Sequence, residues 1–447
     1  MLWIFVIHPY QLTALLPLLI FPFLGICKLT DLAKLYYNDN VVTLLCCSTF
    51  SLCLDRSHLL RRVSLQLLRL GLIGQPLALL MLFGFSTAAV AALARRTLAV
   101  TLMSAMTRAL VLEMKIAVEA KYAKATLSRG IGEELSLEDE EEMKQELDNL
   151  SLVGRSLALN KATSEQVKNY CLNAHSRELL MLELTAYLRE PCLAHPEFWL
   201  LCNGPCTLVL LLFNVIYLYV LHVRKLHSYS EDMRENRREL TRIITTHYTE
   251  EEEPLEAIMI LFLVLFLLLL FTREPVFFPG WTTFLSLKSS VTDATPMVLT
   301  IVVLAFLPLR ALNIINNDGV FRWKSIVPHV PWGLGLMLGS GNAIAYAAQT
   351  SGITEIALDM FDNSKEPTER KLQLTVSVAL ASQLAPGHFD DRLFRSIMDR
   401  TSSDTDHALY YLLPAATAST FTYLLPSSNA ANLMVYHYSN IKLTDMV

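Results

Sequence analysis

The chain has 447 residues, of which 53% are hydrophobic and only 18% charged, with a net charge of -5 and a mean hydropathy of +0.39. Because soluble domains carry about 25% charged residues, this composition excludes an ordinary soluble enzyme, a disordered chain and a coiled coil. The slight acidity also gives no reason to expect a nucleic-acid partner.

Long uncharged runs recur from one end of the chain to the other. They are Met1–Cys27, Leu70–Ala94, Phe198–Val223, Ala257–Thr272, Ala294–Leu309, Ser325–Thr354, Leu372–Phe389 and Ala408–Ile441. Since a helix needs about 20 apolar residues to cross a bilayer, the runs predict about eight to ten membrane-embedded segments. The run Leu261–Phe271 shows none of the alternating polarity of a membrane strand. The predicted fold is therefore an all-α polytopic membrane protein.

A basic segment follows the first of these regions. Asp55–Leu70 mixes leucines with Arg56, Arg61, Arg62 and Arg69, which predicts an amphipathic helix lying at the membrane interface. The alternative is a plain cytoplasmic loop whose arginines obey the positive-inside rule.

Two long polar stretches are predicted to lie in the cytoplasm. Lys121–Arg177 is the longer, and its centre, Glu133–Asp148, holds nine acids against one lysine. It is interpreted as a solvated loop without a folded core. The second, Arg224–Glu253, begins with basic residues next to an apolar run, which favours the cytoplasmic side.

Neither a catalytic centre nor a metal site is predicted. The eight cysteines lie mostly in or beside apolar runs and are interpreted as small buried hydrophobic residues. Cys202 and Cys206 share a helical spacing but have no histidine or acid nearby to complete a metal site. No phosphate loop or nucleophile elbow stands in a usable context, so the chain is not expected to be an enzyme.

One pattern occurs twice. An apolar segment, a short amphipathic piece and a second, interrupted apolar segment span 41–118 and again 332–406. Inverted repeats of this kind are common in secondary transporters.

Four stretches in the same order resemble the sodium-coupled di- and tricarboxylate and sulfate transporters, the divalent anion/sodium symporter family. They are LTALLPLLIFPFLGI (Leu12–Ile26), TREPVFFPGW with VTDATP (Thr272–Trp281 and Val291–Pro296), WKSIVPHVPWGLGLMLGSGNAIA (Trp323–Ala345) and YYLLPAATASTFTYLLPSSNAANLMV (Tyr410–Val435). The resemblance implies secondary transport of succinate, citrate or sulfate. It also implies a homodimer in the plasma membrane with sodium as the coupling ion and no other cofactor, and helices before Met1 and after Val447.

The resemblance further implies an elevator-type fold, in which a scaffold holds a transport domain of two re-entrant hairpins and two broken helices. The expected divisions are first-repeat scaffold and interfacial helix 1–71, first hairpin 72–120, acidic cytoplasmic loop 121–177, degenerate broken helix and following membrane helix 178–223, charged cytoplasmic loop 224–254, second-repeat scaffold 255–362, second hairpin 363–406 and second broken helix 407–447.

The resemblance also gives the expected site. A family hairpin tip carries Ser-Asn-Thr, but the first tip here aligns with Arg95-Arg96-Thr97, and the second, around Ala385–His388, keeps none of the three. The glycine-rich loop of the first broken helix aligns with the charged stretch Ala174–Pro191. The predicted substrate-binding residues are Arg95, Arg96, Thr97, Asn429 and Asn432, and the predicted ion-binding residues are Ser427, Ser428 and Asn429.

Two interpretations of the arginine tip stay open. In one, a guanidinium of Arg95 or Arg96 replaces sodium as the counter-charge of a carboxylate. In the other, the hairpin no longer binds a ligand and the arginines reach water. The second leads to the alternative function, a transport-inactive relative that acts as a dimer partner or regulator.

Overall fold

The computed structural model describes residues 10–67, 76–93, 96–129, 137–164, 196–223, 254–273, 280–284, 291–292, 294–306, 323–352, 375–376 and 430–439. Helices and their connecting turns make up these residues, with no strand among them, which confirms the all-α prediction. Within the same ranges, no helix has both the length and the hydropathy needed to cross a membrane.

The helices are α2 (Tyr10–Thr13), α3 (Leu16–Phe23), α4 (Leu29–Tyr36), α5 (Asp39–Arg56), α6 (Leu59–Leu67), α7 (Pro76–Leu93), α8 (Arg96–Arg129), α9 (Leu137–Ser164), α12 (Pro196–Leu218) with the π-turn η3 (Tyr219–Val223), α15 (Pro254–Phe271), α16 (Trp281–Phe284), α17 (Ala294–Phe306), α18 (Trp323–Ile326) with the 3-10 turn η5 (Val327–His329), α19 (Trp332–Thr350) and α24 (Ala430–Ser439).

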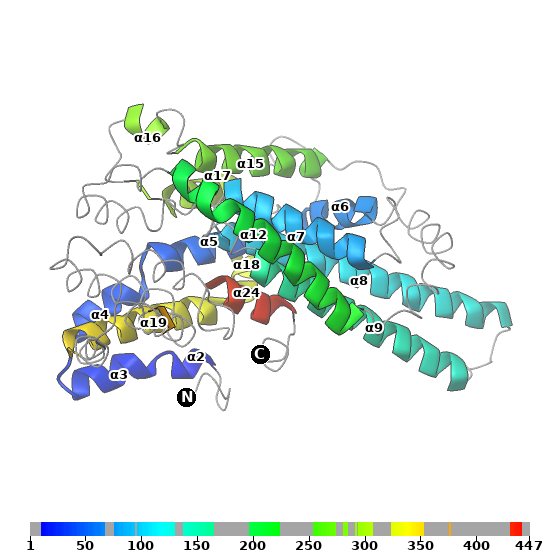
Figure 1. The fold of residues 1–447 in the computed structure, drawn as a ribbon, viewed down its shortest axis with the longest axis horizontal. Coiled ribbons are helices and arrows are strands. Elements are labelled where there is room, and N and C mark those ends of the chain that lie inside the picture. The colour runs from blue at the N-terminus through cyan, green and yellow to red at the C-terminus, as the bar shows by residue number, and fades with distance from the viewer. Residues whose placement is uncertain are drawn as a thin grey trace.

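Helix α5 lies in the interior and contacts α6, α8, α17 and α19 (Figure 1). The side chain of Asn38 caps its first turn by accepting a hydrogen bond from the backbone N–H of Val41 at 3.2 Å, as N-cap residues commonly do. Phe50 of α5 stacks at a tilt on Phe266 of α15, with ring centroids 4.9 Å apart. Cys47 and Cys53 are buried in the same cluster, so the interpretation of these cysteines as core residues is confirmed.

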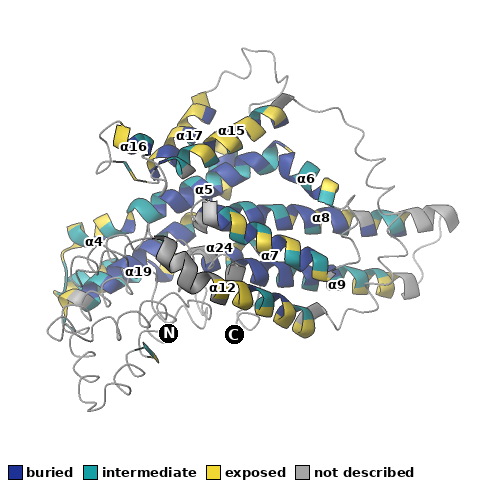
Figure 2. Cartoon of the chain, turned by 45° about the horizontal axis from the view of Figure 1, so that its top comes forward, coloured by how far each residue is buried: buried dark blue, intermediate teal, exposed yellow. Residues whose placement is uncertain are grey.

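Helices α7, α8, α9 and α12 form a second group with its own buried cluster. Helix α7 ends at Leu93 and α8 begins at Arg96, on either side of the predicted tip of the first hairpin. Helix α8 then continues to Arg129, past the expected end of the hairpin at residue 120. Figure 2 shows α5, α8 and α9 largely buried, with exposed residues on the outer sides of α12 and α15.

The interpretation of 121–177 as a solvated loop is wrong for the part that the structure describes. Leu137–Ser164 forms helix α9, and α8 extends to Arg129 beside it. Leu150, Val153 and Leu157 of α9 are buried, and their spacing of three and four residues places them on one helix face. The acidic residues belong to the first half of the helix, where Glu140, for example, is exposed.

Helices α4 and α19 cross at very close range. A Cβ atom added to Gly339 of α19 would lie 2.7 Å from the Cα of Tyr36 in α4. Nearby, the side-chain amide of Asn342 donates to the carbonyl of Leu35 at 3.3 Å, and the Tyr36 hydroxyl donates to the carbonyl of Ala14. The glycine-rich stretch is thus used for helix packing, as small residues are in membrane bundles.

Gly339→Ala is therefore expected to destabilise the protein by about 1–3 kcal/mol, the usual cost of overpacking a tight contact. Main-chain atoms of Tyr36 cannot rotate away, so α19 must move. Gly335→Ala is the matched control on the same helix, because its Cβ would meet only the side chains of Val41 and Leu45, at 3.3 Å and beyond. Thermal unfolding of both variants measures the difference, and equal losses would contradict the predicted close crossing.

Candidate functional site

Most of the predicted site residues fall outside the described part of the chain. Those outside it are Arg95, Ser427, Ser428 and Asn429, together with the second tip around Ala385–His388 and the stretch Ala174–Pro191. Arg96 and Thr97 begin α8 and are described through their main chain alone, whereas the Asn432 side chain is fully buried on α24.

The structure does bring together the two helices that carry the predicted residues. Helix α24, with Asn432, contacts both α8 and α9. One buried apolar cluster joins Leu433 and Met434 of α24 to Val100 of α8 and Ala158 of α9. The segments predicted to supply ligands from the two repeats thus meet, although their order as broken helices stays a prediction.

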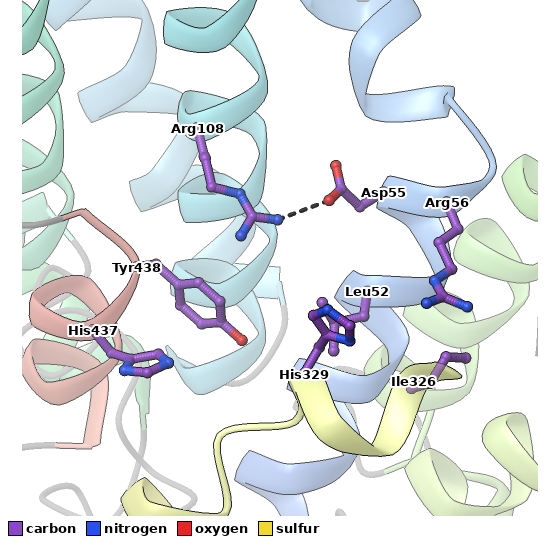
Figure 3. A pocket seen from close by; sticks show the side chains of 8 residues that line it. All are labelled: Leu52, Asp55, Arg56, Arg108, Ile326, His329, His437 and Tyr438. Carbon is purple, nitrogen blue, oxygen red and sulfur yellow. Dashed lines mark hydrogen bonds and ion pairs between the residues drawn. The ribbon is translucent and has the colours of Figure 1, made fainter. Parts of the chain in front are cut away.

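A cavity of about 480 Å³ lies beside this meeting point (Figure 3). Its lining comes from α5, α8, α24 and the short helices around residue 326. The lining residues are Leu52, Asp55, Arg56, Arg108, Ile326, His329, His437 and Tyr438. In the expected divisions, α5 and η5 belong to the scaffold, whereas α8 and α24 belong to the transport domain, so the cavity lies between the two expected domains.

Arg56 and Arg108 line the cavity from opposite sides, and each is fixed by its own contacts (Figure 3). Arg56, in the last turn of α5, donates from Nη2 to the backbone carbonyl of Ser325 at 2.8 Å and to the Ser325 hydroxyl. Arg108 of α8 pairs with Asp55 at 2.7 Å between Nη2 and Oδ2. The Arg108 guanidinium also lies over the ring of Tyr438, 5.7 Å from its centroid, in the arrangement of a cation–π contact.

The imidazoles complete the polar lining. A ring nitrogen of His329, Nδ1, lies 2.9 Å from the carbonyl oxygen of Ser325. His437 packs edge-on against Tyr438, with ring centroids 5.2 Å apart. Side chains that carry N–H groups thus line the cavity from four separate elements, α5, α8, η5 and α24.

The charges of the cavity favour an anion. Asp55 balances Arg108, whereas Arg56 donates to neutral oxygens of Ser325. One positive charge is thus left over without counting the histidines, and guanidinium forks suit carboxylate or sulfate oxygens. None of the predicted site residues lines this cavity; the signal in the sequence was a charged residue, Arg108, inside a long helix, α8, that also packs against the core.

Comparison with known proteins gives a consistent result. The whole chain, residues 1–447, matches the family described as "Sodium:sulfate symporter transmembrane region". The rat Na(+)/citrate cotransporter is 23% identical over all of this chain and 84% of its own length. The sodium-dependent high-affinity dicarboxylate transporter 2 of Caenorhabditis elegans is 24% identical over 100% of this chain and 84% of its own, and mouse solute carrier family 13 member 1 is 24% identical over 100% and 85%.

These matches define a helical integral membrane transport protein rather than an enzyme. The chain belongs to the sodium:sulfate symporter family. The resemblance read from the four sequence stretches is confirmed.

Proposed function

We propose that this chain is a secondary carrier of di- or tricarboxylate anions such as succinate or citrate, or of sulfate. Relatives over its full length are named for citrate and for dicarboxylates, and its family for sulfate. The observation that carries the proposal is the cavity lined by Arg56 and Arg108, because the planar fork of a guanidinium group suits the oxygens of a carboxylate or of sulfate.

Exposed apolar side chains on α12 and α15 support the proposal that the protein is embedded in a membrane. Helices α12 and α15 expose large aliphatic and aromatic side chains on contiguous turns: Leu208, Val209, Phe213, Ile216, Leu261, Val264, Leu265 and Leu268. Apolar patches of this extent mark contact with a partner or with lipid, and in this family we assign them to lipid. A plasma-membrane location and a homodimer formed through the scaffold belong to the same proposal.

The ligand residues predicted from the sequence remain part of the proposed function. Arg95, Arg96, Thr97, Asn429 and Asn432 are proposed for the anion, and Ser427, Ser428 and Asn429 for a cation. Support comes from the contact between α8 and α24, since half-helix ends at such a junction suit charged ligands.

Uptake of radiolabelled succinate, citrate and sulfate by proteoliposomes tests the proposal. We expect at least one of the three to accumulate above protein-free vesicles, and an excess of the unlabelled anion to suppress the signal. The variant Arg95→Ala/Arg96→Ala, run in parallel, tests the predicted tip, because the loss of uptake would assign the guanidinium groups to the anion.

One observation favours the alternative, a transport-inactive relative that acts as a dimer partner or regulator. Arginines stand where the family tip has serine and asparagine, so the tip lacks the small hydroxyl and amide ligands of that motif. Folded protein that takes up none of the three anions, with or without a sodium gradient, would contradict transport and support this second function.

A further inference from the structure

One imidazole of the cavity lies next to Arg56. The carbonyl oxygen of Ser325 is 2.8 Å from Arg56 Nη2 and 2.9 Å from His329 Nδ1. Because a carbonyl oxygen only accepts, Nδ1 of His329 carries the hydrogen of this contact. The second ring nitrogen, Nε2, is therefore the one that can take up a further proton. His329 is exposed, so that proton can come from water.

The second imidazole is paired with Arg108 in a similar way. The ring of Tyr438 lies 5.7 Å from the Arg108 guanidinium and 5.2 Å from the His437 ring, measured to its centroid. His437 is also exposed. Figure 3 shows both imidazoles among the side chains that line the cavity. The cavity thus contains two pairs of a guanidinium and an imidazole, one from α5 and η5 and the other from α8 and α24.

The fixed charges of the cavity do not balance a divalent anion. Among the described lining residues, two arginines and one aspartate leave a single positive charge while the imidazoles are neutral. The Tyr438 hydroxyl is uncharged near neutral pH. Helices α9 and α19 also contact α24, but none of their described residues lines the cavity. Succinate or sulfate would therefore leave one negative charge uncompensated, and one imidazolium would complete the balance.

Anion binding and protonation of the imidazoles favour each other. A guanidinium beside an imidazole disfavours a second positive charge there, whereas an anion bound between them favours it. Small changes of surroundings are enough to change the charge of a histidine near neutral pH. Because the coupling of two binding events is reciprocal, a proton on either imidazole must strengthen anion binding by the same factor.

We propose that the cavity binds its anion together with a proton, which is accepted by the imidazoles of His329 and His437. The inference rests on the proposed function and names the ion that accompanies the anion at this site. The proton comes from water as the anion binds and returns to water when the anion leaves. Histidine chains carry protons in this way in membrane transporters, and a carrier that binds both ions can be driven by a pH gradient.

Proton uptake on anion binding is measured directly by titration calorimetry of the purified chain in sodium-free buffers that differ in ionisation enthalpy. Sulfate is the probe, since it stays a dianion throughout and any proton taken up binds to the protein. We expect about half a proton per sulfate at about pH 7, within the ordinary histidine range. The Kd should then be about tenfold lower at about pH 6 than at about pH 8, because half a proton per pH unit over two units gives one factor of ten.

The variant His329→Gln/His437→Gln tests the assignment of the proton. We expect it to take up no proton and to lose the pH dependence to within about twofold, while its Kd at about pH 8 stays within about threefold of wild type, because glutamine resembles a neutral imidazole in size and polarity. The matched control is His58→Asn: His58 is exposed, does not line the cavity and has a φ of 59°, which asparagine also tolerates. It is expected to behave as wild type.

The outcomes separate this inference from the proposed function. Proton uptake that is lost in the double variant would support the inference even if proteoliposomes accumulated no anion. Sulfate binding or transport by wild type without proton uptake would overturn the inference and leave the carrier function intact. Proton uptake that persists in the folded double variant would overturn it as well, because the proton would then bind elsewhere. The same holds if wild type binds none of sulfate, succinate and citrate at about pH 6.

Discussion

Arg61→Ala is expected to destabilise the protein strongly, by about 3 kcal/mol, because it leaves a buried carboxylate without its ion-pair partner. Glu113 of α8 is only 4% exposed. The Arg61 side chain reaches it from α6, with Nε and Oε1 2.5 Å apart. Arg62 makes the corresponding contact with Glu256 of α15, which is also buried, at 2.7 Å. Two adjacent arginines thus attach α6 to two different helices.

The double variant Arg61→Ala/Glu113→Ala separates the pair from the helix itself. Removing both charges also removes the desolvation cost of the carboxylate, so most of the loss is expected to be recovered. Asp55→Ala is the matched control for an ion pair in a wetter setting, since the side chains of Arg108 and Asp55 are 43% and 39% exposed. An exposed pair is worth about 0–1 kcal/mol. Denaturant unfolding measures all four proteins, and equal losses in Arg61→Ala and Asp55→Ala would contradict the assignment of Glu113 as a buried charge.

This pairing also shows what local sequence could not reveal. Of the arginines expected on an amphipathic helix over Asp55–Leu70, Arg61 and Arg62 do lie on one, α6 (Leu59–Leu67), whereas Arg56 ends α5 and Arg69 lies outside the described residues. Their partners were not predicted, because Glu113 and Glu256 lie far along the chain, and only the packing of α6 against α8 and α15 brings them close. The expectation was a helix at the membrane interface, with no partner named for its arginines; in the structure, acids within the protein pair with Arg61 and Arg62.

The helix α9 was missed for a different reason. Nine acids within Glu133–Asp148 dominate the composition of the stretch and favour a solvated loop. The evidence for a packed helix lies one turn further on, where Leu150, Val153 and Leu157 follow helical spacing. Composition averaged over the whole polar stretch concealed a periodic pattern in its second half, and the buried Asn160 and Lys161 were overlooked with it.

The cavity could not have been predicted by any spacing rule. Asp55, Arg108, His329 and His437 come from four elements, so no short motif contains them. The expected tip at Arg95-Arg96, by contrast, was read from local sequence, because an apolar run ends at this charged pair. Local patterns thus gave a position for the tip, whereas tertiary packing decided which charges meet.

Arg56→Ala and Arg108→Ala are each expected to weaken anion uptake by about tenfold or more, since a hydrogen bond to a charged group contributes about 1.5–3 kcal/mol. The effect should appear as a raised KM, because both guanidinium groups line the cavity in which we expect the anion to bind. Lys324→Ala is the matched control: it removes an exposed positive charge from α18, next to Ser325, without removing a lining residue.

Asp55→Asn is expected to change uptake in the opposite direction. The Asp55 carboxylate forms an ion pair with Arg108, with Oδ2 and Nη2 2.7 Å apart. It therefore competes with any incoming anion for the same guanidinium group. Its neutral isostere leaves Arg108 free to bind the anion and removes the one negative charge among the lining residues, so the KM for the anion should fall. Measuring the KM for succinate, citrate and sulfate in the three cavity variants gives a signed test. If removal of Arg108 and removal of its competitor Asp55 both leave the KM within about twofold, which corresponds to less than 0.5 kcal/mol, the anion does not pass through this cavity.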